Sequence, residues 1–295
     1  MIGRRIWTKP RSIAFLAVVY SAALGIAWLV AVATADLGDW QAILLADVAA
    51  TCFVFVMAVA ANNTSVYDPY WSVAPLPIAL WWAMHGAPSP PLEGVIPNSP
   101  NGARFAAVAI LILLWGIRLT ANFLRGWPGL GHEDWRYTEH RRFGTLRYWL
   151  VSFGGLQMMP TLIVFAAMLP VLAVTRTPGN DFGLLDLAAI AVTAAAIVME
   201  TAADEQKRRH RGPGFVTTGV WGWLRHPNYL GEVTFWWGLW LFALAAGWGN
   251  WWTIAGPAAM TILFVFVSVP LMDRRMLRRP GYREHMDQVG ALIPR

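Results

Sequence analysis

The sequence predicts an all-α protein, a polytopic bundle of transmembrane helices with both termini in the cytoplasm. Of its 295 residues, 57% are hydrophobic and only 14% are charged, whereas soluble domains carry about 25% charged residues. Apolar runs of about 20 residues, each long enough to cross a hydrocarbon core of about 30 Å, recur along the chain. Basic residues gather between alternate runs. We therefore expect one membrane-embedded domain over residues 1–295.

Eight apolar runs are candidate membrane spans. The third is short and contains Pro75 and Pro77, so it is either a broken crossing or a re-entrant segment, and the second case leaves seven spans. The eight runs cover residues 12–34, 40–61, 71–85, 103–124, 150–174, 182–203, 228–247 and 250–271.

The positions of the basic residues set the predicted topology, because short cytoplasmic loops accumulate Lys and Arg. Most of the 23 basic residues lie in the N-terminal arm, the loops after the fourth and sixth runs, and the C-terminal tail. An even number of spans between these segments puts them all on one side. Residues 86–102 are rich in Pro and Gly and predict an irregular outer loop. The tail over residues 273–288 predicts an interfacial helix, interrupted at "RRPGY".

The stretch "WLRHPNYLGE" (Trp223–Glu232) is polar although it opens an apolar run. Pro227 suits the first position of a helix, where unpaired backbone N–H groups and the helix dipole attract an anion. Asn228 and Glu232 are four residues apart and share the helix face below that end. A dinucleotide would fit, and helix capping with lipid-headgroup binding is the simpler alternative. The candidate residues here are Arg225, His226, Asn228, Tyr229 and Glu232.

Two further polar stripes lie at the ends of apolar runs, where ionisable residues are costly unless they face a cavity or a partner. On the sixth run, Glu200, Asp204, Lys207 and Arg211 fall on one helical face. On the fourth run, Arg118 and Asn122 share a face. Charge pairs at a cytoplasmic helix end explain the first stripe without any ligand, and snorkelling could explain a single arginine.

A carboxylate stands between the second and third runs, in "ANNTSVYDPYWSVAP". Asp68 is flanked by Tyr67 and Tyr70, and the segment has no basic residue of its own. Partial desolvation would raise the pKa of this carboxyl and make it a usable acid, although Asp before Pro is also common in turns. No metal site is expected, because His132, Glu133 and His140 lack ligand spacing. Nucleic acid binding is not expected either.

These motifs resemble a family of bacterial membrane proteins, the DUF1295 group, which is similar to the C-terminal domain of steroid 5-alpha-reductases. The resemblance is strongest over residues 200–295, through "ETAADEQKRR", "RHPNYLGE" and "GYREHMDQVGALIPR", with weaker similarity at "DPYWSVAP" and "WGIRLTANFLRG". It implies that residues 200–295 form a cofactor-binding core. The implied activity is reduction of a carbon–carbon double bond conjugated to a ketone, with NADPH held from the cytoplasmic side.

The same resemblance implies roles for single residues. Asp204 and Asn228 would hold the nicotinamide end, and Arg211, Arg274 and Arg275 would lie near the phosphates. Asp68, seven residues before Pro75, matches a family glutamate that binds the substrate ketone. Trp115 stands where the family has a tyrosine, and an indole N–H is a poor proton donor.

Two alternatives remain open. "RHPNYLGE" also resembles the cofactor motif of isoprenylcysteine and phospholipid methyltransferases, which bind S-adenosylmethionine, and a non-catalytic lipid-binding protein needs neither cofactor. In each case the partners are membrane lipids and, for the enzymes, a lipophilic small molecule from the bilayer. Many Ala and Arg residues and few lysines favour a bacterial inner membrane with the site open to the cytoplasm. The sequence does not indicate an oligomeric state.

Overall fold

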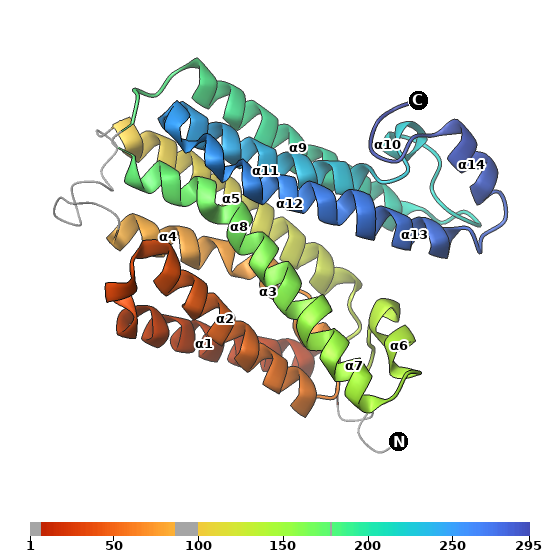
Figure 1. The fold of residues 1–295 in the computed structure, drawn as a ribbon. Helices are drawn as coiled ribbons and strands as arrows, with labels where there is room; N and C mark the ends of the chain where they lie inside the picture. The colour runs from red at the N-terminus through yellow and green to blue at the C-terminus, as the bar shows by residue number, and fades with distance from the viewer. Residues whose placement is uncertain (1–6, 86–99, 178) are drawn as a thin grey trace. The chain divides into compact units, whose positions relative to one another are not determined.

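All regular structure in the described part of the chain is helical, which confirms the fold class. The structure is a computed structural model that describes residues 7–85, 100–177 and 179–295 (Figure 1). Within these ranges one isolated β-bridge joins Leu224 and Gly290, and every other named element is a helix. Six helical stretches of the described residues are long and apolar enough to cross a membrane. The protein is therefore a multi-pass membrane protein, while the number of spans and their orientation stay predictions.

The chain divides into two compact units, and the single membrane-embedded domain with its cofactor-binding core over residues 200–295 stays a prediction. The first unit comprises residues 1–86 and 115–165, and the second comprises residues 87–114 and 166–295. Helices α5 (Pro100–Gly126) and α8 (Met159–Arg176) contribute to both, because the boundaries fall inside them. Parts of the predicted outer loop over residues 86–102, and the basic residues Arg4 and Arg5, lie outside the described residues.

In the first unit, the predicted runs form helices at the expected positions. Pro75 ends α3 (Tyr70–Val73) and begins α4 (Pro75–His85), so the third run is not one uninterrupted spanning helix. The 11 residues of α4 rise about 16 Å, roughly half of a hydrocarbon core. The other elements are α1 (Lys9–Ala33), η2 (Ala35–Leu37), α2 (Asp39–Ala60), η3 (Thr64–Val66), α6 (Trp135–Arg141), α7 (Thr145–Val151) and the π-helix η4 (Ser152–Met158).

In the second unit, the seventh and eighth runs also form helices. The seventh is α11 (Pro227–Ala246), which has 20 residues and lies outside the six candidate spanning stretches. The predicted break in the tail is confirmed, because residues 277–281 separate the last two helices. The remaining elements are α9 (Leu184–Arg209), α10 (Val220–Trp223), η5 (Trp248–Ile254), α12 (Ala255–Leu263), η6 (Phe264–Ser268), α13 (Val269–Met276) and α14 (Tyr282–Gln288).

Two glycines of α11 let it approach α9 closely. A Cβ atom at Gly231 would lie 2.8 Å from Glu200 Cβ and 2.9 Å from the Ala196 carbonyl oxygen. A Cβ atom at Gly238 would lie 2.1 Å from Thr193 Oγ1 and 3.1 Å from Thr193 Cα. The backbone atoms in these contacts cannot rotate away, so the glycines set the separation of the two helices.

We expect Gly238→Ala to destabilise the second unit by about 1–3 kcal/mol, because the added methyl group has no space against Thr193. Thermal unfolding in detergent measures this. Gly249→Ala is the control, because a Cβ atom there would meet nothing within 4 Å. Equal melting temperatures for the two variants would contradict the close packing.

A buried ion pair ties α5 to α9 in the second unit. Arg104 Nε lies 2.6 Å from Asp186 Oδ1, and Arg104 Nη2 lies 2.8 Å from Asp186 Oδ2. Arg104 also donates to the carbonyl oxygens of Asn180 and Asp181. Both charged side chains are almost completely buried, which is tolerated because the pairing is bidentate and the remaining donors are used.

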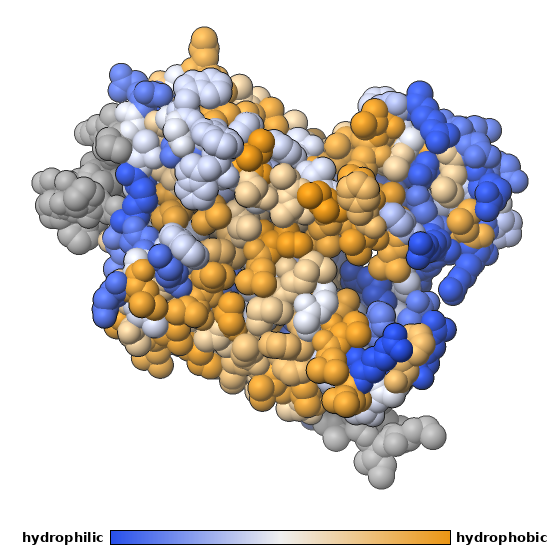
Figure 2. Space-filling model, viewed as in Figure 1, coloured by the Kyte–Doolittle hydropathy of each residue, from blue (hydrophilic) through white to orange (hydrophobic). Residues whose placement is uncertain are grey.

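Apolar side chains dominate the surface over the helices in Figure 2, and hydrophilic ones gather around α13 and α14. Exposed large apolar residues include Val18 and Leu29 on α1 and Ile117 on α5. Soluble proteins rarely expose contiguous apolar surface of this extent. The surface is that of a protein in contact with lipid.

Candidate functional site

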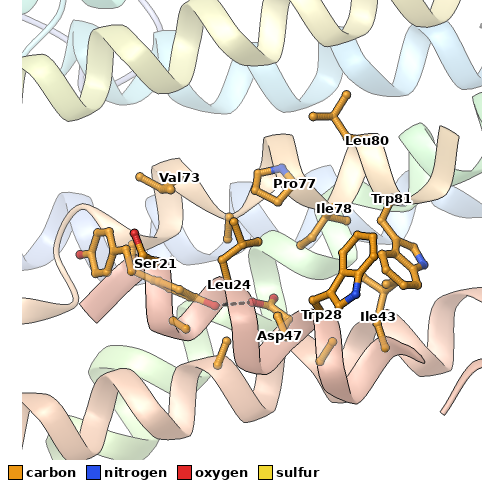
Figure 3. A pocket seen from close by; sticks show the side chains of 18 of the residues that line it. Ser21, Leu24, Trp28, Ile43, Asp47, Val73, Pro77, Ile78, Leu80 and Trp81 are labelled. Atoms are coloured by element: carbon orange, nitrogen blue, oxygen red, sulfur yellow. Dashed lines mark hydrogen bonds between the residues drawn. The ribbon is translucent and has the colours of Figure 1, made fainter. Parts of the chain in front are cut away.

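A largely apolar pocket of about 460 Å³ lies in the first unit between α1, α2 and the α3–α4 segment (Figure 3). Its volume falls within the range of about 300–1,000 Å³ that is common for small-molecule sites. Trp28 and Trp81 pack edge to face at one part of the wall, with ring centroids 4.9 Å apart. Other lining residues include Tyr20, Leu24, Ile43, Asp47, Tyr70, Pro77, Ile78 and Met84.

One carboxylate lines this pocket. Asp47 comes from the middle of α2 and is buried, and the Tyr70 hydroxyl donates a hydrogen bond to its Oδ1 at 3.0 Å. Figure 3 shows this bond beside the apolar side chains of the wall. Burial raises the pKa of Tyr70 well above its ordinary value of 10, so its hydroxyl keeps its proton at neutral pH. The Asp47–Tyr70 pair, with Ser21 as a further polar side chain of the lining, thus offers a lipophilic molecule a place for a polar group.

Asp47 was missed in the sequence analysis, although a signal was present. A lone carboxylate inside an apolar run of span length is costly and usually functional. The ionisable residues singled out above lie at the ends of the fourth and sixth runs, whereas Asp47 lies within the second run. Of the predicted catalytic residues, Tyr70 lines the pocket, whereas Tyr67 and Asp68 are not among its lining residues.

Tyr67 does not line the pocket but packs against the lining residue Tyr70. Its hydroxyl is 2.8 Å from Thr161 Oγ1 on α8, which is 3.0 Å from Thr51 Oγ1 on α2. Thr51 also lies near the Tyr70 hydroxyl and partly offsets the rise in its pKa. The rings of Tyr67 and Tyr70 are 5.5 Å apart. These contacts place Tyr67 in a hydrogen-bonded network that includes the pocket residue Tyr70.

Asp68 occupies the turn before α3 and is half-buried. Tyr137 of α6 donates a hydrogen bond to its Oδ1. Burial raises the pKa of Asp68 to about 6, and the nearby Arg136 guanidinium and the Tyr137 hydrogen bond lower it in part. The raised pKa agrees with the expectation from sequence. The sequence did not show that α6 would bring a cation and a tyrosine to this carboxyl.

This raised pKa predicts a pH-dependent stability. The ordinary value is 3.8, so Asp68 binds its proton more tightly in the folded chain. Its contribution to stability is full below that value and is lost as the pH rises through about 6.

We expect Asp68→Asn, which resembles the protonated form, to be more stable than wild type at about pH 7.5 by on the order of 1–3 kcal/mol. The two proteins should match near about pH 4. Thermal unfolding as a function of pH checks this, with exposed Asp36→Asn as the control. Parallel profiles for wild type and Asp68→Asn would contradict the assignment.

In the second unit, Arg225 and His226 bind Asp273 of α13. Arg225 Nη2 lies 3.0 Å from Asp273 Oδ2, and His226 Nε2 lies 2.8 Å from Asp273 Oδ1. The Tyr282 hydroxyl donates to the same Oδ1 at 2.6 Å, and Arg225 Nη1 donates to the Val289 carbonyl oxygen at 2.5 Å. These contacts hold the C-terminal segment against the start of α11.

The predicted direct anion contact of Arg225 and His226 is therefore not what the structure shows. Both side chains are buried and engaged inside the protein. Tyr229 stacks on His226 with ring centroids 5.2 Å apart, and its ring edge meets Phe264. Asn228 is half-buried at the first turn of α11. Sequence reasoning identified a cluster here but assigned its charges to a ligand in place of Asp273.

The other predicted residues of α9 and α11 differ in exposure. Glu232 is buried and accepts a hydrogen bond from Trp236 Nε1 at 2.7 Å. Glu200 is also buried, and its Cβ atom faces Gly231. Asp204 is half-buried one turn further along α9. The two buried carboxylates are thus embedded in the α9–α11 contact, and only Asp204 reaches partial exposure.

Cations gather around Lys207 at the C-terminal end of α9. The ammonium group of Lys207 interacts electrostatically with Asp204, Arg275 and Arg279. The Arg279 guanidinium donates to the Gly214 carbonyl oxygen, which ties the segment after α13 to the segment after α9. Arg274 and Arg211 are exposed, and Arg211 donates to the Arg208 carbonyl oxygen. Lys207 and Arg275 are far apart in sequence but lie near each other in the structure. Arg279, which was not among the predicted cofactor-binding residues, lies near Lys207 as well.

Arg118 and Asn122 of α5 belong to the first unit and are half-buried. Trp115, one turn earlier, is fully buried against Trp71, with ring centroids 5.7 Å apart. Glu200, Asp204 and Asn228 belong to the second unit. The two sets thus lie in different units.

Comparison with known proteins identifies the family. The family model described as "Protein of unknown function (DUF1295)" matches residues 54–289. The chain belongs to the DUF1295 family. A relative from Schizosaccharomyces pombe, described as an uncharacterized protein, is 28% identical over 264 residues, which cover 79% of this chain and 73% of the relative. No solved structure matches.

The DUF1295 match includes most of the residues described above, from the Tyr67–Tyr70 segment to Asp273. Asp47 and the pocket-lining residues of α1 precede the matched range. The match confirms the resemblance to the DUF1295 group, whereas the similarity to steroid 5-alpha-reductases stays a prediction. Activity and cofactor are matters for proposal.

Proposed function

We propose that the protein is an NADPH-dependent membrane oxidoreductase that reduces a carbon–carbon double bond conjugated to a ketone in a lipophilic, steroid- or isoprenoid-like substrate. The observation that carries this proposal is the Asp47–Tyr70 pair in the wall of an apolar pocket. A flat apolar enone has one polar atom, its ketone oxygen, and the buried Asp47–Tyr70 pair is a polar position in the wall that suits it. The bilayer would supply such a substrate.

The pair suits the electronic demand of this reaction. Negative charge develops on the ketone oxygen as hydride adds to the β carbon, and donors aimed at that oxygen stabilise it most in a site that excludes water. Tyr70 has one hydroxyl proton, which it donates to Asp47 Oδ1 at 3.0 Å. When Asp47 is protonated, its carboxyl donates to the Tyr70 oxygen and the Tyr70 proton turns to the ketone oxygen. The tryptophans of the wall supply apolar surface that excludes water.

The second unit has residues that suit the anionic part of a dinucleotide. Lys207, Arg275 and Arg279 come together there, with Arg274 and Arg211 exposed nearby in sequence. Cations suit pyrophosphate and a ribose phosphate. Asp204 and Asn228 remain the candidates for the nicotinamide end, as the family resemblance implies. When bound, the cofactor supplies the hydride, and we expect it to enter from the cytoplasm of a bacterial cell.

Ligand-dependent thermal shift tests the cofactor assignment, because a ligand at about 100 times its Kd stabilises the folded state by about 2.7 kcal/mol. We expect NADPH to raise the melting temperature of wild type and to have less effect on Asn228→Ala, Asp204→Ala and the double variant Lys207→Ala/Arg275→Ala. Arg125→Ala, exposed on the first unit, is the control. Stabilisation by S-adenosylmethionine alone would favour a methyltransferase, and no shift with either would favour a lipid-binding protein.

Turnover tests the reaction itself. Protein reconstituted in nanodiscs is given NADPH and progesterone, an enone of suitable size, and oxidation of the nicotinamide is followed together with the reduced ketone. Isoprenoid enones extend the test to other substrate shapes. Absence of NADPH oxidation with all of these, in protein that binds NADPH, would contradict the proposed reaction.

A further inference from the structure

A chain of buried hydroxyl groups runs from the pocket into the interior of the first unit. It begins beside the Asp47–Tyr70 pair, where Thr51 lies near the Tyr70 hydroxyl. Thr51 is hydrogen-bonded to Thr161, with 3.0 Å between the two threonine oxygens. Thr161 Oγ1 is in turn 2.8 Å from the Tyr67 hydroxyl. Thr51 and Thr161 are almost completely buried, as is Tyr67. Two helices and a turn therefore contribute to one line of hydrogen bonds: Thr51 from α2, Thr161 from α8 and Tyr67 from the turn before α3.

The far end of this chain lies beside Asp68. The Asp68 carboxyl interacts electrostatically with the hydroxyls of Tyr67 and Tyr20. Around it stand Tyr137, Arg136 and Asp134, with a hydrogen bond from Ser65. Arg136 is 44% exposed at its side chain, so this carboxyl lies next to the protein surface. The hydrogen-bonded hydroxyls thus end at Tyr67, which lies near a carboxyl close to solvent.

Each hydroxyl group between the two carboxyls, on Thr51, Thr161 and Tyr67, can accept one proton and donate another. Serine, threonine and tyrosine hydroxyls both donate and accept, whereas amide or guanidinium groups in the same positions would interrupt proton transfer. Hydrogen bonds in such a line also polarise one another. A purely structural pairing of polar groups would not require a line with a carboxyl at both ends.

We propose that Asp68, Tyr67, Thr161 and Thr51 form a proton relay that supplies the Asp47–Tyr70 pair. This inference rests on the proposed function, and it makes Tyr67, Thr161 and Thr51 positioning residues that act through Tyr70. The proposed relay includes Asp68 and Tyr67 and leads to Tyr70, and all three residues were candidates from the sequence.

The relay balances the reaction. Hydride adds to the β carbon, the electron pair of the double bond moves toward the carbonyl, and the ketone oxygen takes a proton from the Asp47–Tyr70 pair. The resulting enol tautomerises to the saturated ketone, so each turnover consumes one hydride and one proton. Each hydroxyl of the relay passes a proton to its neighbour, and solvent returns one proton to Asp68.

Hydroxyl exchange tests the relay without any turnover. The chain has 7 tyrosines, and in protein carrying ¹³C at the tyrosine ζ position, the deuterium isotope shift reports exchange of each hydroxyl proton with solvent. Tyr→Phe variants assign the signals. We expect exchange at Tyr70 to slow by about tenfold or more in Thr161→Val, because the path is interrupted at an isosteric position.

Thr120→Val is the matched control, since it removes another hydroxyl pair of the same unit, with Ser72 at 2.8 Å. Thr51→Val interrupts the same path and replaces Thr161→Val if the latter does not fold. Unchanged exchange at Tyr70 in a folded variant at Thr161 or Thr51 would overturn the relay.

Kinetics provide the second measurement. In an active protein, Thr161→Val should lower kcat by about tenfold with KM for progesterone unchanged and with a larger solvent deuterium isotope effect. Asp68→Asn should remove the limb of the pH profile near 6. Normal kcat and pH profile in both variants would also overturn the relay. Failure of wild type to oxidise NADPH would contradict the proposed function, whereas the exchange measurement would still decide whether the path exists.

Discussion

Replacing Asp273 by alanine is expected to lower the free energy of unfolding of the second unit by about 3–5 kcal/mol. The side chains of Arg225 and Asp273 are only 8% and 10% exposed. Without the carboxylate, a charged guanidinium stays buried opposite His226 and Tyr282, and the C-terminal segment loses the group that three side chains share. Chemical unfolding in detergent, followed by tryptophan fluorescence, measures the loss.

Asp287→Ala is the control for this prediction, because Asp287 is exposed on α14. The double variant Arg225→Met/Asp273→Leu adds a sharper test. Removing both charges in favour of apolar groups of similar volume is often neutral, whereas removing one is costly. We therefore expect the double variant to recover much of the stability. A small loss for Asp273→Ala would show that the cluster contributes little to holding the C-terminal segment.

The helices could be predicted from the sequence because each depends on the residues of its own segment. A run of about 20 apolar residues must satisfy its backbone polar groups internally, and only a helix does so within one segment. The ends of α1, α2 and α11 accordingly lie within a few residues of the predicted runs. Pro75 and Pro77 also had the predicted effect, since proline lacks the N–H that a continuous helix needs.

The candidate sites were harder to predict because their causes are not local. The motif around Arg225 shows two cations at a helix start, which is the local pattern of an anion site. It cannot show that Asp273, 48 residues further on, satisfies that arginine. The pocket depends in the same way on the approach of Tyr70 to Asp47 across 23 residues. The carboxylate of Asp47 could have been noticed from sequence, but its partner and the cavity around it could not.

The division into two units is a further point that hydropathy does not reveal. Both boundaries fall inside long apolar helices, α5 and α8, so no linker composition marks them. A continuous apolar run can serve two packing environments, because its turns contact different neighbours along its length. Periodicity reports that a segment is helical and apolar but not which other helices it contacts.

Tyr70→Phe is expected to reduce turnover of an enone by about 100-fold or more, since positioned proton donors contribute roughly 10²–10⁴-fold to such reactions. Binding should change much less, because the apolar wall of the pocket is intact. Progesterone affinity is measured by quenching of tryptophan fluorescence, with Trp28 and Trp81 in the wall. Turnover is measured by NADPH oxidation in nanodiscs. The predicted signature is a large fall in kcat with a small change in affinity.

Tyr20→Phe is the matched control for this prediction. Tyr20 lines the same pocket, and its ring meets that of Tyr70 at 5.7 Å, but its hydroxyl donates to the Val66 carbonyl oxygen at 2.7 Å. Loss of that hydroxyl removes a tyrosine oxygen from the same wall without touching the Asp47–Tyr70 bond. Asp47→Asn should lower turnover as Tyr70→Phe does. The amide can still accept the hydrogen bond, but it carries neither charge nor a transferable proton. Equal turnover in Tyr20→Phe and Tyr70→Phe would show that the pair by Asp47 does not set the chemistry of the pocket.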